Sequence, residues 1–154
     1  MGLFTKKTMI RGFTCGAFDL LHPGHLFFFE KAKEECDWLI IGLQTDPSID
    51  RPDKNKPCES VFERWYRLNA VKHVDEIIPY DTEADLYNLL ILQEPDLRFL
   101  GFEYAGEDYT GDDIGIEVRF IARHHDYSST HLRGKIASIA TGGAYGYFGK
   151  RGKS

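Results

Sequence analysis

Short apolar runs alternate along this chain with segments in which apolar residues recur every three or four positions. Apolar or β-branched runs typical of buried strands occur at residues 9–15, 38–44, 75–80, 97–100 and 117–122. Segments typical of amphipathic helices occur at residues 23–33, 60–71, 82–93 and 129–140. The alternation of strands and helices predicts an α/β fold with a parallel sheet.

We expect a Rossmann-like doubly wound sheet of about five strands in the order 3-2-1-4-5, with helices on both faces. Residues 1–141 are predicted to form a single domain. Residues 142–154, rich in Gly, Tyr and Lys, are predicted to form a flexible tail. Ligands of such sheets bind at the carboxyl ends of the strands, where the strand order reverses. Functional residues are therefore expected just after the first strand.

Composition limits the classes of function. The 154-residue chain carries a net charge of -5, which argues against bulk binding of nucleic acid. Its apolar runs are too short to span a bilayer, and its N-terminus lacks a signal-peptide pattern. Cys15, Cys36 and Cys58 show no C-x-x-C spacing, so we predict neither disulfides nor a metal site. We expect a soluble cytoplasmic protein that engages neither nucleic acid nor a membrane.

The segment GAFDLLHPGH at residues 16–25 connects the first predicted strand to the first predicted helix. Pro23 suits the first helical position, and Gly24 allows close approach of a ligand to the backbone. His22 and His25 flank the free N–H groups and the positive dipole end of the helix, a favourable place for an anion. The alternative is an exposed helix start that contains two histidines by chance. We interpret the segment as a phosphate site in which both histidines stabilise developing charge.

A second candidate phosphate site lies at the start of the last predicted helix. Hydroxyls of Ser128, Ser129 and Thr130 can bind phosphate together with the free N–H groups there. Arg123, at the end of the preceding strand, can add a bidentate clamp. Ordinary capping of the helix by Ser and Thr is the alternative interpretation.

These segments resemble motifs of the cytidylyltransferase-like nucleotidyltransferase superfamily, whose signature is G-x-F-D-x-x-H-x-G-H. Residues 72–79, KHVDEIIP, and residues 123–130, RHHDYSST, resemble two further motifs, R-Y-V-D-E-V-I-P and R-T-x-G-I-S-T-T, in the same order. Within the superfamily the chain most resembles bacterial glycerol-3-phosphate cytidylyltransferases, from residue 9 to about residue 140.

The resemblance implies roles for charged residues outside the histidine segment. Lys54 and Lys56 match a catalytic K-x-K pair in a loop, for which a solvated charged loop is the alternative. Asp46 matches a residue that binds the glycerol hydroxyls, although an Asp before Pro also suits a turn. Arg64 and Lys72 match two arginines near the substrate, and Lys72 lacks the guanidinium fork.

The resemblance also implies a nucleotide site, and there the chain departs from the family. A base-recognising Asp is replaced by Phe102, which offers stacking only, so Glu103 would have to accept a hydrogen bond from the base. His124 and Asp126 replace Thr and Gly in the late motif. The predicted nucleotide-binding residues are Gly16, Ala17, Phe18, Gly24, Phe102, Glu103, Ser128, Ser129 and Thr130.

The function that the resemblance implies is transfer of CMP from CTP to glycerol 3-phosphate, with His22, His25, Lys54, Lys56 and Arg123 catalytic. Magnesium would accompany the triphosphate. Alternatives are a choline- or ethanolamine-phosphate cytidylyltransferase, an adenylyltransferase for a sugar or pantetheine phosphate, and a nucleotide-binding module without catalysis. The resemblance further implies a homodimer, for which the aromatic surplus, including Trp65 and Tyr66, is weak support.

Overall fold

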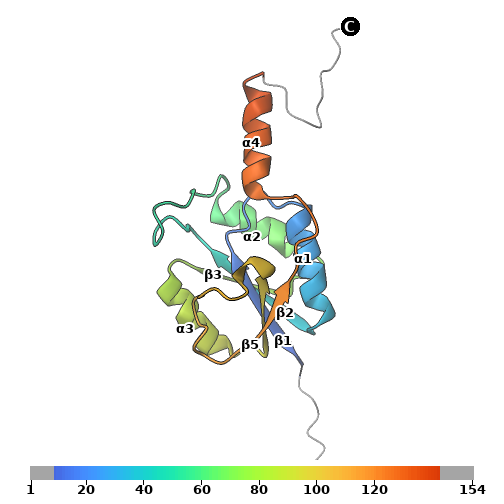
Figure 1. The fold of residues 1–154 in the computed structure, drawn as a ribbon, viewed down its shortest axis with the longest axis vertical. Coiled ribbons are helices and arrows are strands. Elements are labelled where there is room, and N and C mark those ends of the chain that lie inside the picture. The colour runs from blue at the N-terminus through green and yellow to red at the C-terminus, as the bar shows by residue number, and fades with distance from the viewer. Residues whose placement is uncertain (1–8, 143–154) are drawn as a thin grey trace, which may run out of the picture.

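The computed structural model describes residues 9–142 and contains a five-stranded parallel sheet (Figure 1). The strands are β1 (Arg11–Gly16), β2 (Trp38–Gln44), β3 (Glu76–Tyr80), β4 (Leu97–Gly101) and β5 (Glu117–Ile121). They are ordered β3-β2-β1-β4-β5, and every neighbouring pair is parallel. The predicted α/β fold and strand order are confirmed.

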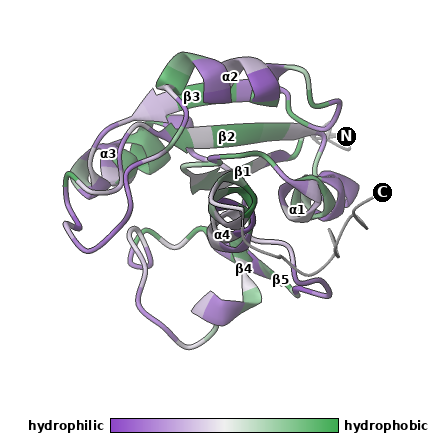
Figure 2. Ribbon diagram, turned by 90° about the horizontal axis from the view of Figure 1, so that it is seen from above, coloured by the Kyte–Doolittle hydropathy of each residue, from purple (hydrophilic) through white to green (hydrophobic). Residues whose placement is uncertain are grey.

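Three of the four helices of the described residues pack on this sheet and cover both of its faces, as predicted (Figure 2). The four helices are α1 (Pro23–Glu34), α2 (Val61–Asn69), α3 (Glu83–Gln93) and α4 (Ser129–Ala140), with a short 3-10 turn η1 (Phe102–Tyr104) after β4. Buried side chains of α1 and α2 pack in one core cluster with Leu39, Ile41 and Phe99. Leu86, Leu89 and Leu90 of α3 pack with Phe13 and Ile40 on the opposite face. The alternation of the strand side chains assigns successive residues to these two clusters.

The helix α4 differs from the other three helices because none of its residues is buried. Figure 1 shows it projecting from the sheet, with its first turn beside the start of α1. Except for Gly142, the tail predicted at 142–154 lies outside the described residues. Across residues 9–142, no helix has the length and apolar character needed to cross a membrane.

A buried arginine hydrogen-bonds to both the β1–α1 turn and the β2–α2 connection at the carboxyl edge of the sheet. Arg64 of α2 is 1% exposed. Its guanidinium donates to the carbonyl of Gln44 at 2.7 Å and to that of Thr45 at 2.6 Å, at the end of β2. It also donates to the carbonyls of Ala17 at 2.9 Å and Glu59 at 3.1 Å. Four of the five donors of the side chain thus serve backbone carbonyls, which differs from the expectation that Arg64 binds substrate.

Replacing this side chain should destabilise the fold. Arg64→Lys retains the charge but loses the planar fork, so buried carbonyls lose their donors. We expect the free energy of unfolding to fall by about 2–4 kcal/mol in urea denaturation.

Arg67→Lys provides the matched control one turn later on α2. Arg67 lies half exposed and pairs with Glu59 at 2.9 Å, so its replacement should cost less than about 1 kcal/mol. If both variants lose the same free energy of unfolding, the bonds of Arg64 to the backbone carbonyls do not have this stabilising role.

Candidate active site

A broad cleft of about 1480 Å³ opens at the carboxyl edge of the sheet, where ligands of this fold class bind. It lies over the ends of β1, β4 and β5, extends along α1 from its first turn to Glu35, and reaches the first turns of α3 and α4. The residues that line it include many of those predicted from the sequence, namely Gly16, Phe18, His22, Gly24, His25, Glu103, Arg123, Ser128 and Ser129. The two predicted phosphate segments, a hundred residues apart in sequence, therefore share one cleft.

Two imidazoles cap the N-terminus of α1. The N–H of Gly24 donates to Nδ1 of His22 at 3.0 Å, and the N–H of His22 donates to Nδ1 of His25 at 3.2 Å. This reciprocal arrangement is a capping box in which imidazoles replace the usual hydroxyl and carboxamide. The rings stack with their centroids 3.8 Å apart. Pro23 occupies the first turn, as predicted.

The capping box determines which nitrogen of each ring carries a proton. Both Nδ1 atoms accept backbone hydrogen bonds, so in the neutral imidazoles the proton lies on Nε2. His22 and His25 therefore each offer one N–H donor away from the backbone. Two such donors at the positive end of a helix suit a phosphate oxygen.

Burial keeps the two rings neutral. Removal from water lowers the pKa of His25 to about 3, with the nearby His22 and Arg123 acting in the same direction. Burial, followed by the charges of His125 and Arg123, also lowers the pKa of His22. At neutral pH both side chains are therefore uncharged hydrogen-bond donors.

This lowered pKa should make stability depend on pH. Below pH 6.5 the unfolded chain protonates His25, whereas the folded chain does so only near pH 3, so stability falls as pH falls through this window. Between pH 7 and pH 5 the loss from this residue should be about 2 kcal/mol.

His25→Gln isolates the effect, because glutamine can accept the same bond from the backbone but does not titrate. Urea unfolding at pH 7 and pH 5 should show a smaller loss for this variant than for the wild type. The same loss in both proteins would contradict a neutral, buried His25.

The turn before α1 is conformationally strained. Phe18 and Leu20 each have a φ of 49°, a left-handed conformation that costs free energy in residues other than glycine. The Phe18 ring contacts the ring of His25 edge-on, with centroids 5.4 Å apart, and also packs on Phe29. The strained turn thus places an aromatic wall beside the imidazole pair.

Asp19 fixes this turn, a role that the sequence analysis did not assign. Its carboxylate, 3% exposed, accepts from the N–H groups of Cys58 at 2.8 Å and Glu59 at 3.0 Å. It also pairs with Arg133 of α4 at 2.5 Å. Burial raises the pKa of Asp19, but the bonds from Cys58, Glu59 and Arg133 outweigh it and leave the pKa below its ordinary value. The D of the G-x-F-D pattern was the available signal.

The start of α4 lies against the same turn. The Ser129 hydroxyl donates to the Asp19 carbonyl at 2.7 Å, and the Ser128 hydroxyl caps the helix by accepting from the His131 N–H at 3.0 Å. Arg123 donates to the carbonyls of His125 and Tyr127. Capping, the alternative interpretation, is thus present for Ser128, and phosphate binding by these residues stays a prediction. Thr130 is exposed and does not line the cleft.

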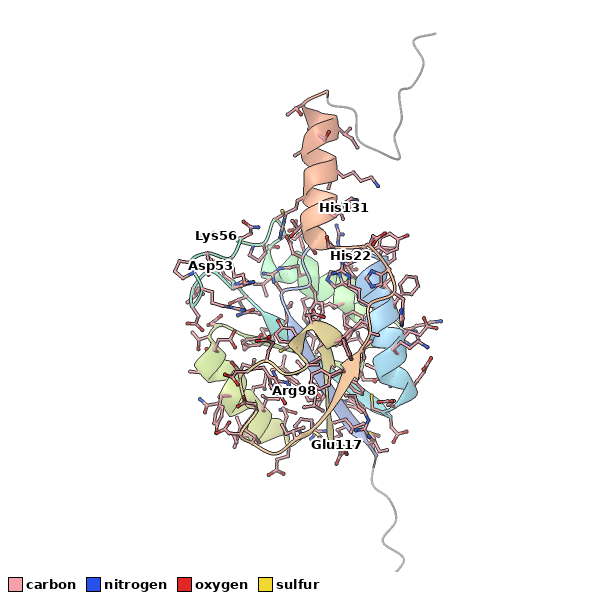
Figure 3. The ribbon with its side chains drawn as sticks, in the orientation of Figure 1. His22, Asp53, Lys56, Arg98, Glu117 and His131 are labelled. Atoms are coloured by element: carbon pink, nitrogen blue, oxygen red, sulfur yellow. The ribbon has the colours of Figure 1, made fainter. Side chains whose placement is uncertain are left out.

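The loop after β2 places its charges differently from the expectation. Lys54 and Lys56 are exposed and do not line the cleft, and Figure 3 shows Lys56 on that loop, apart from His22. Asp46 accepts from the N–H and hydroxyl of Ser48 at 2.9 and 2.7 Å, as a turn-forming Asp does. These bonds lower its pKa. Arg51 is the basic residue of this loop that lines the cleft. The roles assigned to both lysines and to Asp46 stay predictions.

Three further predicted residues lie outside the cleft. Lys72 is exposed and precedes β3, so it lies at the amino edge of the sheet, opposite the histidines. Phe102 is 62% exposed and does not line the cleft, whereas the adjacent Glu103 does. Ala17 contributes its carbonyl to Arg64 and no lining surface. The resemblance identified these positions along the chain but could not say where their side chains point.

The wall of the cleft on the α3 side holds polar residues that the sequence analysis missed. Arg98 of β4 is 2% exposed, donates to the carbonyl of Thr110 and lies 5.1 Å from the ring centroid of Tyr109. Glu83 of α3 accepts from the Thr110 hydroxyl at 2.7 Å and pairs with Arg51 at 3.4 Å. These bonds attach the segment after η1 to the sheet. No motif marks them, because a lone Arg within a strand carries no spacing signal.

Residues 13–135 match the cytidylyltransferase-like family, and these residues include both helix starts that line the cleft. The chain belongs to this family. The histidine capping box of this cytidylyltransferase-like protein is therefore part of a nucleotidyltransferase domain.

Relatives support the family assignment but not the expected assignment to a subfamily. The bifunctional protein HldE of a Nitratiruptor species is 37% identical over 88% of this chain and 30% of its own length. HldE of a Caulobacter species is 36% identical over 86% of this chain and 28% of its own length. The chain thus spans less than a third of these relatives. They do not support the expected special resemblance to glycerol-3-phosphate cytidylyltransferases.

Solved structures share the fold. The lipopolysaccharide core biosynthesis protein of Thermoplasma volcanium is 27% identical with a TM-score of 0.61, covering 78% of this chain and 99% of its own. Pantothenate synthetase of Thermus thermophilus, at 16% identity and a TM-score of 0.57, covers 86% of this chain and 71% of its own. The second likeness concerns the fold alone.

Proposed function

We propose that this nucleotidyltransferase transfers an adenylyl group from ATP to the phosphate of a sugar phosphate, with release of pyrophosphate. The observation that carries the reaction type is the pair of neutral imidazoles at the start of α1, whose capping bonds occupy Nδ1 and leave the Nε2–H groups as donors. Neutral donors held by the backbone suit charge that develops on a phosphate in the transition state.

The reaction requires positioning rather than a nucleophilic side chain. An oxygen of the acceptor phosphate attacks the α-phosphorus of the nucleotide, and the bond from that phosphorus to the bridging oxygen of pyrophosphate breaks. His22 and His25 would hydrogen-bond the α-phosphate oxygens, while Arg123 and the start of α4 neutralise charge on the other phosphates. No net proton transfer is needed when a phosphate dianion attacks.

Two observations favour a sugar phosphate and ATP over glycerol 3-phosphate and CTP. The related protein of Thermoplasma volcanium is named for lipopolysaccharide core biosynthesis, and glycan assembly consumes nucleotide-activated sugars. The features that suggested the cytidylyl reaction are weak here, because Lys54 and Lys56 do not line the cleft and Phe102 replaces the base-recognising Asp. Glu103, which does line the cleft, can accept a hydrogen bond from the exocyclic amine of adenine as well as from that of cytosine, so it is compatible with ATP without excluding CTP.

Magnesium would enter with the triphosphate as part of the substrate. Within residues 9–142 no cluster of three or more His, Cys, Asp or Glu side chains is placed to hold a metal ion. Asp19, the acid nearest the histidines in the motif, is already engaged with Cys58, Glu59 and Arg133. Triphosphate oxygens and water would therefore supply the ligands of the magnesium ion.

A screen of substrate pairs tests the proposal. ATP, CTP, GTP and UTP are each combined with magnesium and with sugar 1-phosphates, glycerol 3-phosphate, phosphocholine and phosphopantetheine. Pyrophosphate release is measured for every pair. We expect release from ATP that depends on an added sugar phosphate.

Two variants test the role of the imidazoles separately from the identity of the substrates. His25→Ala should lower turnover by about 10²–10³-fold, the usual loss for one transition-state donor. Leu92→Ala, at an exposed α3 position, should not. Pyrophosphate release from CTP with glycerol 3-phosphate would contradict the proposed substrates. Near-normal activity of His25→Ala would contradict the proposed role of the imidazoles.

A further inference from the structure

A third imidazole, that of His125, lies at the start of α1, and the sequence analysis assigned it no role. His125 comes from the segment between β5 and α4, where it stands at the unspecified position of the late motif, between His124 and Asp126. It lines the cleft together with His22 and His25. Three histidine rings, from two segments about a hundred residues apart, therefore meet at one helix end.

The position of the ring is defined by its contact with Gly24. A Cβ placed on Gly24 would lie only 2.5 Å from Cε1 of His125 and 2.8 Å from Cε1 of His22. Both rings therefore rest on the α-carbon of this glycine, edge to backbone. This contact explains why position 24 needs a glycine, since any side chain would displace both imidazoles.

The proton of the third ring is also placed by the backbone. Nδ1 of His125 accepts from the N–H of Tyr127 at 3.1 Å, so in the neutral ring the proton lies on Nε2. Nε2 is bonded to Cε1, the atom that rests on Gly24. The donor of His125 thus lies close to the first turn of α1, as those of His22 and His25 do.

Aromatic neighbours hold the ring in this place. The centroid of His125 lies 5.8 Å from that of Phe27 and 5.7 Å from that of Tyr127. Tyr127 in turn stacks near-parallel on His22, with centroids 6.5 Å apart. The Arg123 guanidinium donates to the carbonyl of His125 at 3.3 Å. The imidazole is therefore packed on one edge and bonded on another, with Nε2–H as its remaining donor.

We propose that His125 is a further catalytic residue, which donates its Nε2–H to the pyrophosphate leaving group. This inference rests on the proposed nucleotidyl transfer. His125 lies on the segment that joins Arg123 to the start of α4, so it belongs to the second predicted phosphate segment while its ring lies beside Gly24 of the imidazole pair. A donor there meets the oxygen that gains charge as the bond from the α-phosphorus to the bridging oxygen breaks.

Two conservative variants separate this role from packing. In His125→Asn the side-chain oxygen can replace Nδ1 and accept from Tyr127, but no donor reaches the place of Nε2. In His125→Gln the longer side chain places an amide donor near the position of Nε2. We expect His125→Asn to lower turnover at least about tenfold with little change in KM for the acceptor, and His125→Gln to stay within about threefold of the wild type.

Binding of inorganic pyrophosphate with magnesium, measured by calorimetry, gives a readout independent of base and acceptor. Weaker binding by His125→Asn than by His125→Gln supports the proposal, even if no substrate pair releases pyrophosphate and the proposed function fails. Equal binding and equal turnover of both variants and the wild type overturn it. A loss confined to His125→Gln also overturns it, because the bond to Tyr127 would then be what matters.

Discussion

The arrangement of the site depends on the need of α1 to have its first N–H groups capped. In this protein the caps are imidazoles, and because each accepts through Nδ1, each presents a proton on Nε2. The requirement of the helix and the requirement of a phosphate are met by the same tautomer. Burial removes the alternative of a charged ring, so the donors stay neutral at the pH of the cell.

Two buried charged side chains, Arg64 and Asp19, position the capping box through hydrogen bonds to backbone groups. Arg64 donates to carbonyls of the β1–α1 turn and of the β2–α2 connection. Asp19 accepts from N–H groups of the same β2–α2 connection and pairs with Arg133 of α4. Each charge is nearly inaccessible and hydrogen-bonded, which is the condition under which buried charge is tolerated. These contacts hold the strained turn at Phe18 and Leu20 in place and bring the start of α4 beside α1.

The fold could be predicted from the sequence because its signals are local. Within residues 9–142, strand and helix periods define nine elements to within about two residues, and the strand order follows from general rules for such sheets. The histidine segment was identifiable for the same reason, since its spacing alone places both rings at a helix start. Side-chain direction beyond a regular element was not accessible in this way. Lys72 matches a family position yet lies at the opposite edge of the sheet, and Arg64 directs its charge to carbonyls.

Residues missed by the sequence analysis act across long separations. Asp19 contacts Arg133 across 114 positions, and His125 rests on Gly24 across a similar distance. No pattern of spacing reports such a contact. His124 and Asp126 were noted as departures from the family, but nothing in the sequence singled out His125 between them, and its contact with Gly24 becomes visible only in the structure.

The central claim is that His22 and His25 are neutral at pH 7 and carry their protons on Nε2. Long-range proton–nitrogen correlation NMR of the imidazole rings reports the protonation of each nitrogen directly. The account predicts that Nδ1 of both residues is unprotonated and Nε2 protonated at pH 7. A proton on Nδ1 of either ring, or an imidazolium at that pH, would contradict it.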